Sequence, residues 1–170
     1  MLTENLIKEL SKKLSEPEWL LKRRLQAYKK FKELEMPSFK YGIGIFVDIS
    51  DLNIENINPL NGIDKNIVVS NEDVEVLTFT QALEKNSDLI KEYFMTKCVS
   101  SNENKFTALH AAFFNNGILI KIPENVNVKN PIQINLDLTS QARLEHILII
   151  AEKNSKAVIV ETSKSNKEDK

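Results

Sequence analysis

The chain has 170 residues, of which 42% are hydrophobic, with 23 Lys and Arg against 24 Asp and Glu. This balance argues against general nucleic-acid binding, which needs an excess of cations to displace counterions. Cys98 is the only cysteine. An internal disulfide and a zinc site built on paired thiols are therefore excluded, and a reducing compartment is indicated.

The sequence also bears on the cellular compartment of the protein. Residues 1–5 lack the basic and apolar blocks of a secretory signal, and no apolar run is long enough to span a bilayer. We therefore expect a cytoplasmic protein with neither a membrane nor a nucleic-acid partner. The length suits one ordinary domain, or two small parts that share a core.

Two helices are predicted at the start of the chain. Leu6, Leu10 and Leu14 recur every four residues and predict an amphipathic helix over 3–14. A second helix is predicted over 19–34, because apolar side chains return at helical spacing until Pro37. Before it, "SEPE" at 15–18 has the form of a capping box, with the proline in the first turn.

Basic residues gather on this second helix: Lys22, Arg23, Arg24, Lys29, Lys30 and Lys32. Charges between apolar positions usually form the solvated face of a helix, and we expect that here. The functional alternative is a docking surface for an acidic partner.

The middle of the chain mixes both element types. Short strands are expected at 43–47, 67–69 and 74–77, with a polar, irregular segment at 53–61. Helices are expected over 80–96 and 105–114, the second stopped by Asn116 and Gly117.

After Gly117 the period of the apolar residues changes to two. Short strands are predicted at 118–120, 126–128, 132–138, 147–150 and 157–160. Such serial strands fit a sandwich, a barrel or the stacked rungs of a β-helix, and no strict period decides between them. We divide the chain into a mainly helical region (1–116), a strand region (117–162) and a frayed polar tail (163–170).

The histidines His110 and His146 are the first candidates for a site. They lie 36 positions apart, and with Cys98 they offer three metal ligands, but this spacing matches no local metal motif. A histidine within an apolar helix is more often packed and hydrogen-bonded. Cys98 has no base near it in sequence that would activate a nucleophile.

Other motifs give no catalytic residue either. Gly42 and Gly44 form a Gly-x-Gly without a third glycine, so a nucleotide-binding loop is not predicted. A β-helix hydrolase would need clustered carboxylates, and Asp137, Glu145 and Glu152 are the available ones. A polysaccharide-binding module would display aromatic residues, which the strands after Gly117 lack. We expect no catalytic, cofactor-binding or metal-binding residue and no enzymatic activity.

Three stretches together resemble the SufB/SufD family of iron–sulfur cluster assembly proteins. They are "EPEWLLKRRLQAYKKFKELEMPSF" at 16–39, "KFTALHAAFFNNGILIKIPENVNVKNPIQI" at 105–134 and "ARLEHILIIAEKNSKAVIVET" at 142–162. Their order and spacing are specific, although each stretch alone is a weak signal. The sequence "ALHAA" and the lack of a cysteine-rich N-terminal motif indicate a closer resemblance to SufD than to SufB.

The resemblance implies an α+β fold, in which a helical N-terminal region leads into the first rungs of a right-handed parallel β-helix over 117–162. It implies a non-enzymatic scaffold that works with a SufC-like ABC ATPase and a SufB- or SufD-type partner subunit. Family members are much longer, and their cluster-associated cysteine and histidine and their ATPase-docking part would follow Lys170. No cluster ligand is therefore carried over to this chain.

Two further expectations follow from the resemblance. A β-helix that stops after a few rungs would expose an apolar end strand, so we expect self-association by strand pairing at 157–160. The alternative function is a stand-alone β-helix binding module without a role in cluster assembly.

Overall fold

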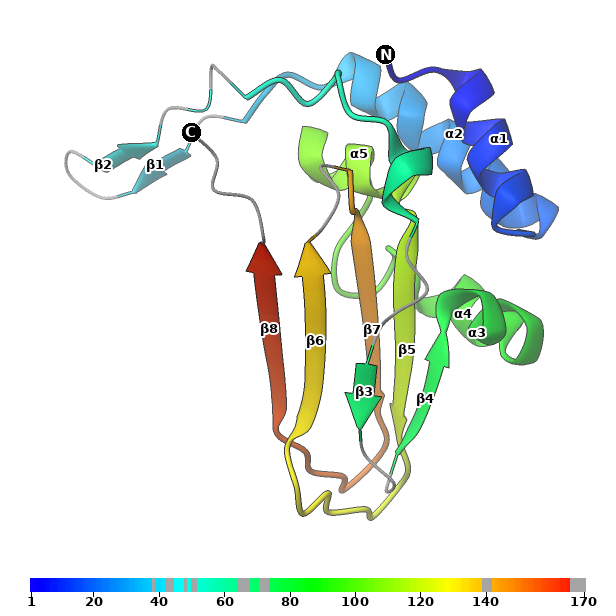
Figure 1. Cartoon of the computed structure of the whole chain (residues 1–170), viewed down its shortest axis with the longest axis vertical. Helices are drawn as coiled ribbons and strands as arrows, with labels where there is room; N and C mark the ends of the chain where they lie inside the picture. The colour runs from blue at the N-terminus through cyan, green and yellow to red at the C-terminus, as the bar shows by residue number, and fades with distance from the viewer. Residues whose placement is uncertain are drawn as a thin grey trace.

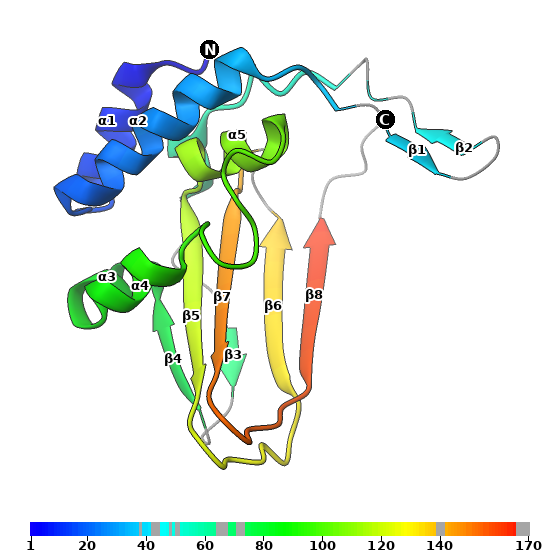
Figure 2. The ribbon, with the colours of Figure 1, turned by 180° about the vertical axis from the view of Figure 1, so that it is seen from behind.

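The structure is a computed structural model that describes residues 1–37, 39–41, 45–47, 49, 52–63, 68–70, 74–138 and 142–165. Helices gather at one end and along one side of two layers of strands (Figures 1 and 2). The helices are α1 (Glu4–Lys13), α2 (Glu18–Glu33), α3 (Phe79–Lys85), α4 (Ser87–Tyr93) and α5 (Lys105–Phe113), with a 3-10 turn η1 (Pro59–Gly62). The strands are β1 (Phe39–Tyr41), β2 (Ile45–Val47), β3 (Val68–Ser70), β4 (Glu75–Thr78), β5 (Asn116–Ile122), β6 (Ile132–Leu138), β7 (Glu145–Ala151) and β8 (Ile159–Ser165).

Helices α1, α2 and α5 share one core. Thr3 caps α1 by accepting a hydrogen bond from the Leu6 amide at 3.2 Å. The apolar faces of the three helices bury Ile7, Phe31 and Phe113 among other side chains. The long helices at the start of the chain therefore form as their leucine spacing predicts, and α5 packs against them across more than seventy intervening residues.

The predicted capping box before α2 is wrong. Pro17, not Ser15, is the N-cap residue of α2, and no side chain caps this end. Ser15 has a φ of 53°, because the chain reverses directly after α1, and the Ser15 and Glu16 amides donate to carbonyls of that helix. The Glu16 carboxylate turns inward to Arg24.

The strands form two three-stranded sheets and the separate hairpin β1–β2. One sheet has the order β4-β5-β7 and the other β3-β6-β8. Each sheet contains one antiparallel pair, β4–β5 or β3–β6, and one parallel pair, β5–β7 or β6–β8. The last two strands, β7 and β8, lie at the edges of their sheets.

The expectation of a right-handed parallel β-helix is wrong: the described residues form an α+β molecule with two small mixed sheets. Strands β3 and β4 come before α5 in the chain, and they pair antiparallel with β6 and β5. A period of two predicts that a segment is a strand, but it does not name the partner of that strand. The partners here produce mixed sheets rather than a series of parallel rungs.

Strand β5 is buried on both faces, which explains its nearly continuous apolar sequence. Ile118, Ile120 and Ile122 face the β3-β6-β8 sheet and pack against Ile132, Ile134 and Leu136 of β6. On the opposite face, Leu119 packs against side chains of α3 and α4. Strand β5 therefore connects the core between the sheets with the core beneath the helices.

Several predicted boundaries differ from the structure. The helix expected over 80–96 is divided into α3 and α4 at Asn86. The strand expected at 126–128 is reduced to one bridge between Asn127 and Lys156. Strand β8 extends further along the chain than the expected 157–160. Gly42 and Gly44, and residues 166–170 of the expected tail, lie outside the described residues.

Gly117 has a different role from the predicted helix stop. Helix α5 ends before Phe114, and Gly117 lies within β5. A Cβ atom at this position would lie 2.7 Å from the backbone oxygen of His146 and 3.2 Å from the ring of Phe79. The close approach of β7 and α3 therefore requires a residue without a side chain here.

Candidate functional site

The two histidines meet in the structure. Nε2 of His110 on α5 lies 2.9 Å from Nδ1 of His146 on β7, so one ring nitrogen donates its proton to the other. In the parallel register of β5 and β7, His146 lies opposite Gly117. Because Gly117 has no side chain, His146 can approach α5 at this point.

Burial keeps both rings uncharged. It lowers the pKa of His110 to about 4, with the positive charge of Arg24 as a second cause. It lowers the pKa of His146 to about 3, and the neighbouring His110 adds to this effect. At pH 7 the two rings therefore form a neutral pair that shares one proton between the facing nitrogens.

Aromatic rings surround this pair. The ring of His146 lies 4.6 Å from that of Phe94 and 5.8 Å from that of Phe79, both centroid to centroid. The ring of His110 stacks on Phe114 at 6.1 Å. The pair therefore belongs to an aromatic cluster (Phe79, Phe94, Phe114, His110 and His146) that joins α3, α4, α5 and β7.

A buried ion pair adjoins the same cluster. The Arg24 guanidinium donates to both carboxylate oxygens of Glu16, at 2.7 and 2.5 Å, and to the carbonyl of Ala112 at 3.0 Å. The guanidinium also lies 3.8 Å from the centroid of the Phe114 ring. Both charged side chains are at most 1% exposed. Arg24 therefore does not belong to the solvated basic face expected for α2.

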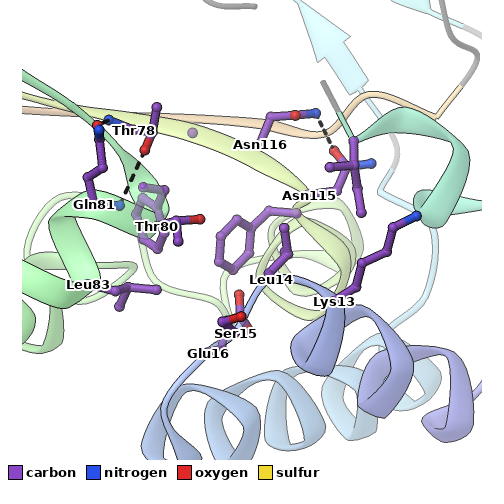
Figure 3. A pocket seen from close by; sticks show the side chains of 14 residues that line it. Lys13, Leu14, Ser15, Glu16, Thr78, Thr80, Gln81, Leu83, Asn115 and Asn116 are labelled. Atoms are coloured by element: carbon purple, nitrogen blue, oxygen red, sulfur yellow. Dashed lines mark hydrogen bonds between the residues drawn. The ribbon is translucent and has the colours of Figure 1, made fainter. Parts of the chain in front are cut away.

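A cavity of about 530 Å³ opens beside the cluster (Figure 3). Lys13 and Ser15 approach it from the α1–α2 turn, and Thr80 approaches it from the start of α3. The side chains of Phe79 and Phe114 form an aromatic part of the cavity wall. The cavity thus combines an apolar interior with a few polar groups near its mouth.

Two buried asparagines at the edge of this cavity connect distant segments. The Asn115 amide donates to the carbonyls of Pro59 (2.7 Å) and Ala142 (2.6 Å), and its oxygen accepts from the Leu144 amide (2.8 Å). Asn116 donates to the carbonyl of Gly62 at 2.6 Å. These amides hold η1 and the start of β7 against β5.

The three residues considered as possible metal ligands, His110, His146 and Cys98, do not gather. Within the described ranges, no group of three or more His, Cys, Asp or Glu side chains is placed to hold a metal ion. Cys98 is exposed on the segment between α4 and α5. The structure thus brings the two histidines together as a hydrogen-bonded pair.

The carboxylates considered for hydrolysis are also placed separately. Glu145 pairs with Arg143 at 3.0 Å, and Glu152 accepts a hydrogen bond from the Glu124 amide at 3.2 Å. The side chain of Asp137 lies outside the described residues. The two described carboxylates form contacts within the fold.

Sequence reasoning missed Arg24 and Asn115 as central residues. Arg24 stands among other cations on its helix, and Asn115 stands directly before Asn116 and Gly117, which were predicted to stop a helix. A usable signal did exist for Arg24: its neighbours Leu20, Ala27 and Tyr28, at helical spacing, are all apolar.

Fold and site together define an α+β domain in which buried polar side chains fasten helices to two small sheets. A family profile described as "SufBD protein N-terminal region" matches residues 47–134, more than half of the chain. The chain belongs to this SufBD family, as the sequence resemblance predicts.

Individual relatives agree with the family match. The chain is 30% identical over 191 residues to the iron–sulfur cluster assembly protein SufD of Bacillus subtilis, an alignment that covers 91% of the chain and 44% of the relative. It is 29% identical over 208 residues to a SufBD family iron–sulfur cluster assembly protein of Staphylococcus haemolyticus, with 94% and 43% covered. The chain therefore spans less than half the length of these curated relatives. No helix in the described part of the chain is long and apolar enough to cross a membrane.

Proposed function

We propose that this chain is the N-terminal portion of a non-enzymatic scaffold subunit in an iron–sulfur cluster assembly complex. The proposal rests chiefly on membership of the SufBD family and on relatives whose names state iron–sulfur cluster assembly. Its compartment would be the cytoplasm, as expected from the single cysteine Cys98.

The contacts of the site support a scaffold rather than a catalyst. The His110–His146 pair, the Arg24–Glu16 pair and the Asn115 amide each join elements that are distant in sequence. These contacts join protein groups to one another, which is the pattern of groups that hold a fold together. A catalytic group would instead direct a reactive atom toward a substrate.

The proposed partners are a SufC-like ABC ATPase and a second SufB- or SufD-type subunit. We assign ATPase docking to the part of the longer relatives that this chain does not span. The full-length parent protein should therefore bind the ATPase, and this chain alone should not.

The edges of the two sheets support the proposed self-association. Among the described strands, β7 and β8 each pair on one side only. On β7, Ile149 lies beside the buried Ile120 of β5 and yet is 41% exposed. Val158 and Val160, at the start of β8, are 60% and 42% exposed. A second copy of the chain that adds a strand beside β7 or β8 would cover these side chains.

Co-purification tests the scaffold proposal. The full-length parent and this chain are each expressed with the ATPase and the partner subunit of the same assembly system. We expect both to be retained by the parent, and the ATPase to be lost from this chain. Submicromolar ATPase binding to this chain would contradict the proposed docking part.

Anaerobic reconstitution with iron and sulfide tests the second element of the proposal. We expect no stoichiometric cluster on this chain. Its two histidines bind each other, and Cys98 does not belong to a group of three or more metal-ligating side chains among the described residues. A visible absorbance band of a bound cluster, with matching iron and sulfide content, would overturn the assignment.

A further inference from the structure

A groove of about 570 Å³ is lined by residues of α2, of the segment that joins α4 to α5, and by Ala111 of α5. Its α2 wall includes Arg23, Gln26 and Lys30, which lie on one face of the helix because they are three or four residues apart. The opposite wall is formed by residues of the 94–102 segment, and the groove shares no lining residue with the cavity at the α1–α2 turn.

The charged side chains that line the groove are all cations. Arg23, Lys29 and Lys30 line it, and no acidic residue of the described chain does. Arg23 donates to the carbonyls of Lys91 (2.7 Å) and Phe94 (3.4 Å), and no carboxylate among the described residues lies within ion-pair distance of it. Burial lowers the pKa of Arg23, as expected for a cation that loses water without gaining a counter-charge.

The two lysines can reach a ligand at little cost. Lys29 forms no ion pair with a described carboxylate, and the Lys30–Glu33 pair has half-exposed side chains that can rearrange. On the opposite wall, the Ser101 hydroxyl and the Asn102 amide supply hydrogen-bond donors. The rim of the groove therefore offers several positive and polar groups to an anion.

The floor of the groove is apolar. Ala27, Phe94 and Ala111 line it and are each at most 4% exposed, and Met95 is partly buried beside them. A small inorganic anion would gain nothing from such a floor. A peptide that carries an apolar side chain between carboxylates would match the floor and the rim together.

We propose that this groove binds an acidic peptide segment of a partner protein, with an apolar side chain on the floor and carboxylates at the basic rim. The carboxylates would contact Lys29 and Lys30 and accept hydrogen bonds from the 94–102 segment. This interaction is separate from ATPase docking and from the sheet edges, and it uses the basic residues of α2 that the fold leaves exposed.

The test uses a short synthetic peptide of glutamate and leucine residues, with its fluorescence anisotropy measured as the chain is added. We expect saturable binding that weakens as salt is raised. Lys29→Gln combined with Lys30→Gln should weaken binding by about tenfold. The matched control is Lys129→Gln, on the exposed loop after β5, and it should leave the affinity unchanged.

Two measurements locate the peptide and check the fold. The synthetic peptide carries a photoactivated cross-linker, and its cross-links on the chain should map to the 94–102 segment and α2. The thermal unfolding midpoint of the Lys29→Gln, Lys30→Gln double variant should equal that of the unsubstituted chain, because both lysines are exposed.

Several outcomes would overturn the proposal. These are no binding of the peptide, equal weakening by Lys129→Gln, cross-links outside the groove, and equally tight binding of a lysine–leucine peptide. Displacement of the peptide by inorganic phosphate at matched concentration would instead assign the groove to small anions.

Discussion

Nε2 of His110 and Nδ1 of His146 lie 2.9 Å apart in a surrounding of aromatic rings, and this contact joins α5 to β7. Because each ring has its pKa lowered by burial, the contact exists between neutral rings. Protonation of either ring would place a charge beside Arg24 or beside the other ring.

The first prediction is therefore a loss of stability in mild acid. The folded-state pKa values are about 4 for His110 and about 3 for His146, against 6.5 for ordinary histidine. Between pH 6.5 and 4 the unfolded chain binds up to two more protons than the folded one. The free energy of unfolding should be highest above pH 6.5 and fall as the pH drops, by at most about 3 kcal/mol per pH unit.

Urea unfolding measured at a series of pH values by the fluorescence of Trp19, the only tryptophan, checks this slope. The double variant His110→Leu with His146→Leu should show a shallower dependence between pH 6.5 and 5. Parallel curves for the parent and the double variant would show that other groups cause the acid sensitivity.

The second prediction concerns the buried ion pair of Arg24 and Glu16. Arg24→Ala leaves the Glu16 carboxylate buried without its counter-charge and should reduce the free energy of unfolding by about 3–5 kcal/mol. Replacing both partners, with Arg24→Met and Glu16→Leu, should cost much less than either single change.

Urea unfolding of Arg24→Met alone, Glu16→Leu alone and the double variant forms a cycle that separates the pair from its surroundings. Lys22→Ala is the matched control, since Lys22 pairs with Glu18 on the surface, and it should barely move the urea midpoint. Additive effects of the two replacements in the cycle would contradict a coupled buried pair.

The helices were the most predictable part of the fold. The leucine spacing at 3–14 and the apolar spacing at 19–34 match α1 and α2 within a residue at each end. Local periodicity was sufficient there because each helix hides one face and exposes the other. The capping box failed because Ser15 is needed for the reversal after α1 and Glu16 pairs with Arg24.

The arrangement of strands could not be predicted in the same way. Apolar alternation located β6 and β7, but the antiparallel pairing of β3 with β6 and β4 with β5 depends on contacts between residues forty or more positions apart. The burial of Arg24 and the contact of the two histidines depend on the same long-range packing. Candidate site residues were therefore visible in the sequence, while their partners were not.

The third prediction tests the close approach at Gly117. Gly117→Ala places a Cβ atom 2.7 Å from the His146 oxygen, so β5 and β7 must separate locally. We expect a loss of about 1–3 kcal/mol in the free energy of unfolding. Lys121→Ala, on the same strand, is the control and should have a smaller effect. An unchanged unfolding midpoint for Gly117→Ala would show that the strands can adjust there.

The fourth prediction concerns Asn115. Asn115→Ala removes the donors to the Pro59 and Ala142 carbonyls and the acceptor for the Leu144 amide, all of which are buried or partly buried. Each buried polar group left without a partner costs about 1–3 kcal/mol, so the loss of three partners should lower the free energy of unfolding by several kcal/mol. The loss should be much smaller only if water enters and replaces the Asn115 side chain.

Asn115→Asp should also destabilise the chain, because a carboxylate cannot donate to the two carbonyls. Asn61→Ala, an exposed asparagine on η1, is the matched control. Hydrogen exchange at the Leu144 amide, directly before β7, gives a local readout: exchange should be faster in Asn115→Ala, which lacks the acceptor, and less affected in Asn115→Asp, whose carboxylate still accepts this hydrogen bond. Unchanged exchange there in Asn115→Ala would contradict the role of Asn115 in fastening β7.

The last prediction concerns the edge of the β4-β5-β7 sheet. Ile149 lies in register with the buried Ile120, but no strand of the described residues pairs with β7 on its other side, and the Ile149 side chain is 41% exposed. If a second copy covers this edge, the chain should self-associate in a concentration-dependent way, as measured by size-exclusion chromatography with light scattering. Ile149→Lys should shift the population toward monomer, because a strand edge with a charged side chain disfavours further pairing.

Leu52→Lys, which changes another exposed apolar side chain far from β7 in the sequence, should leave the assembly as it is. A monodisperse monomer at every concentration of the parent chain would remove the proposed contact between copies.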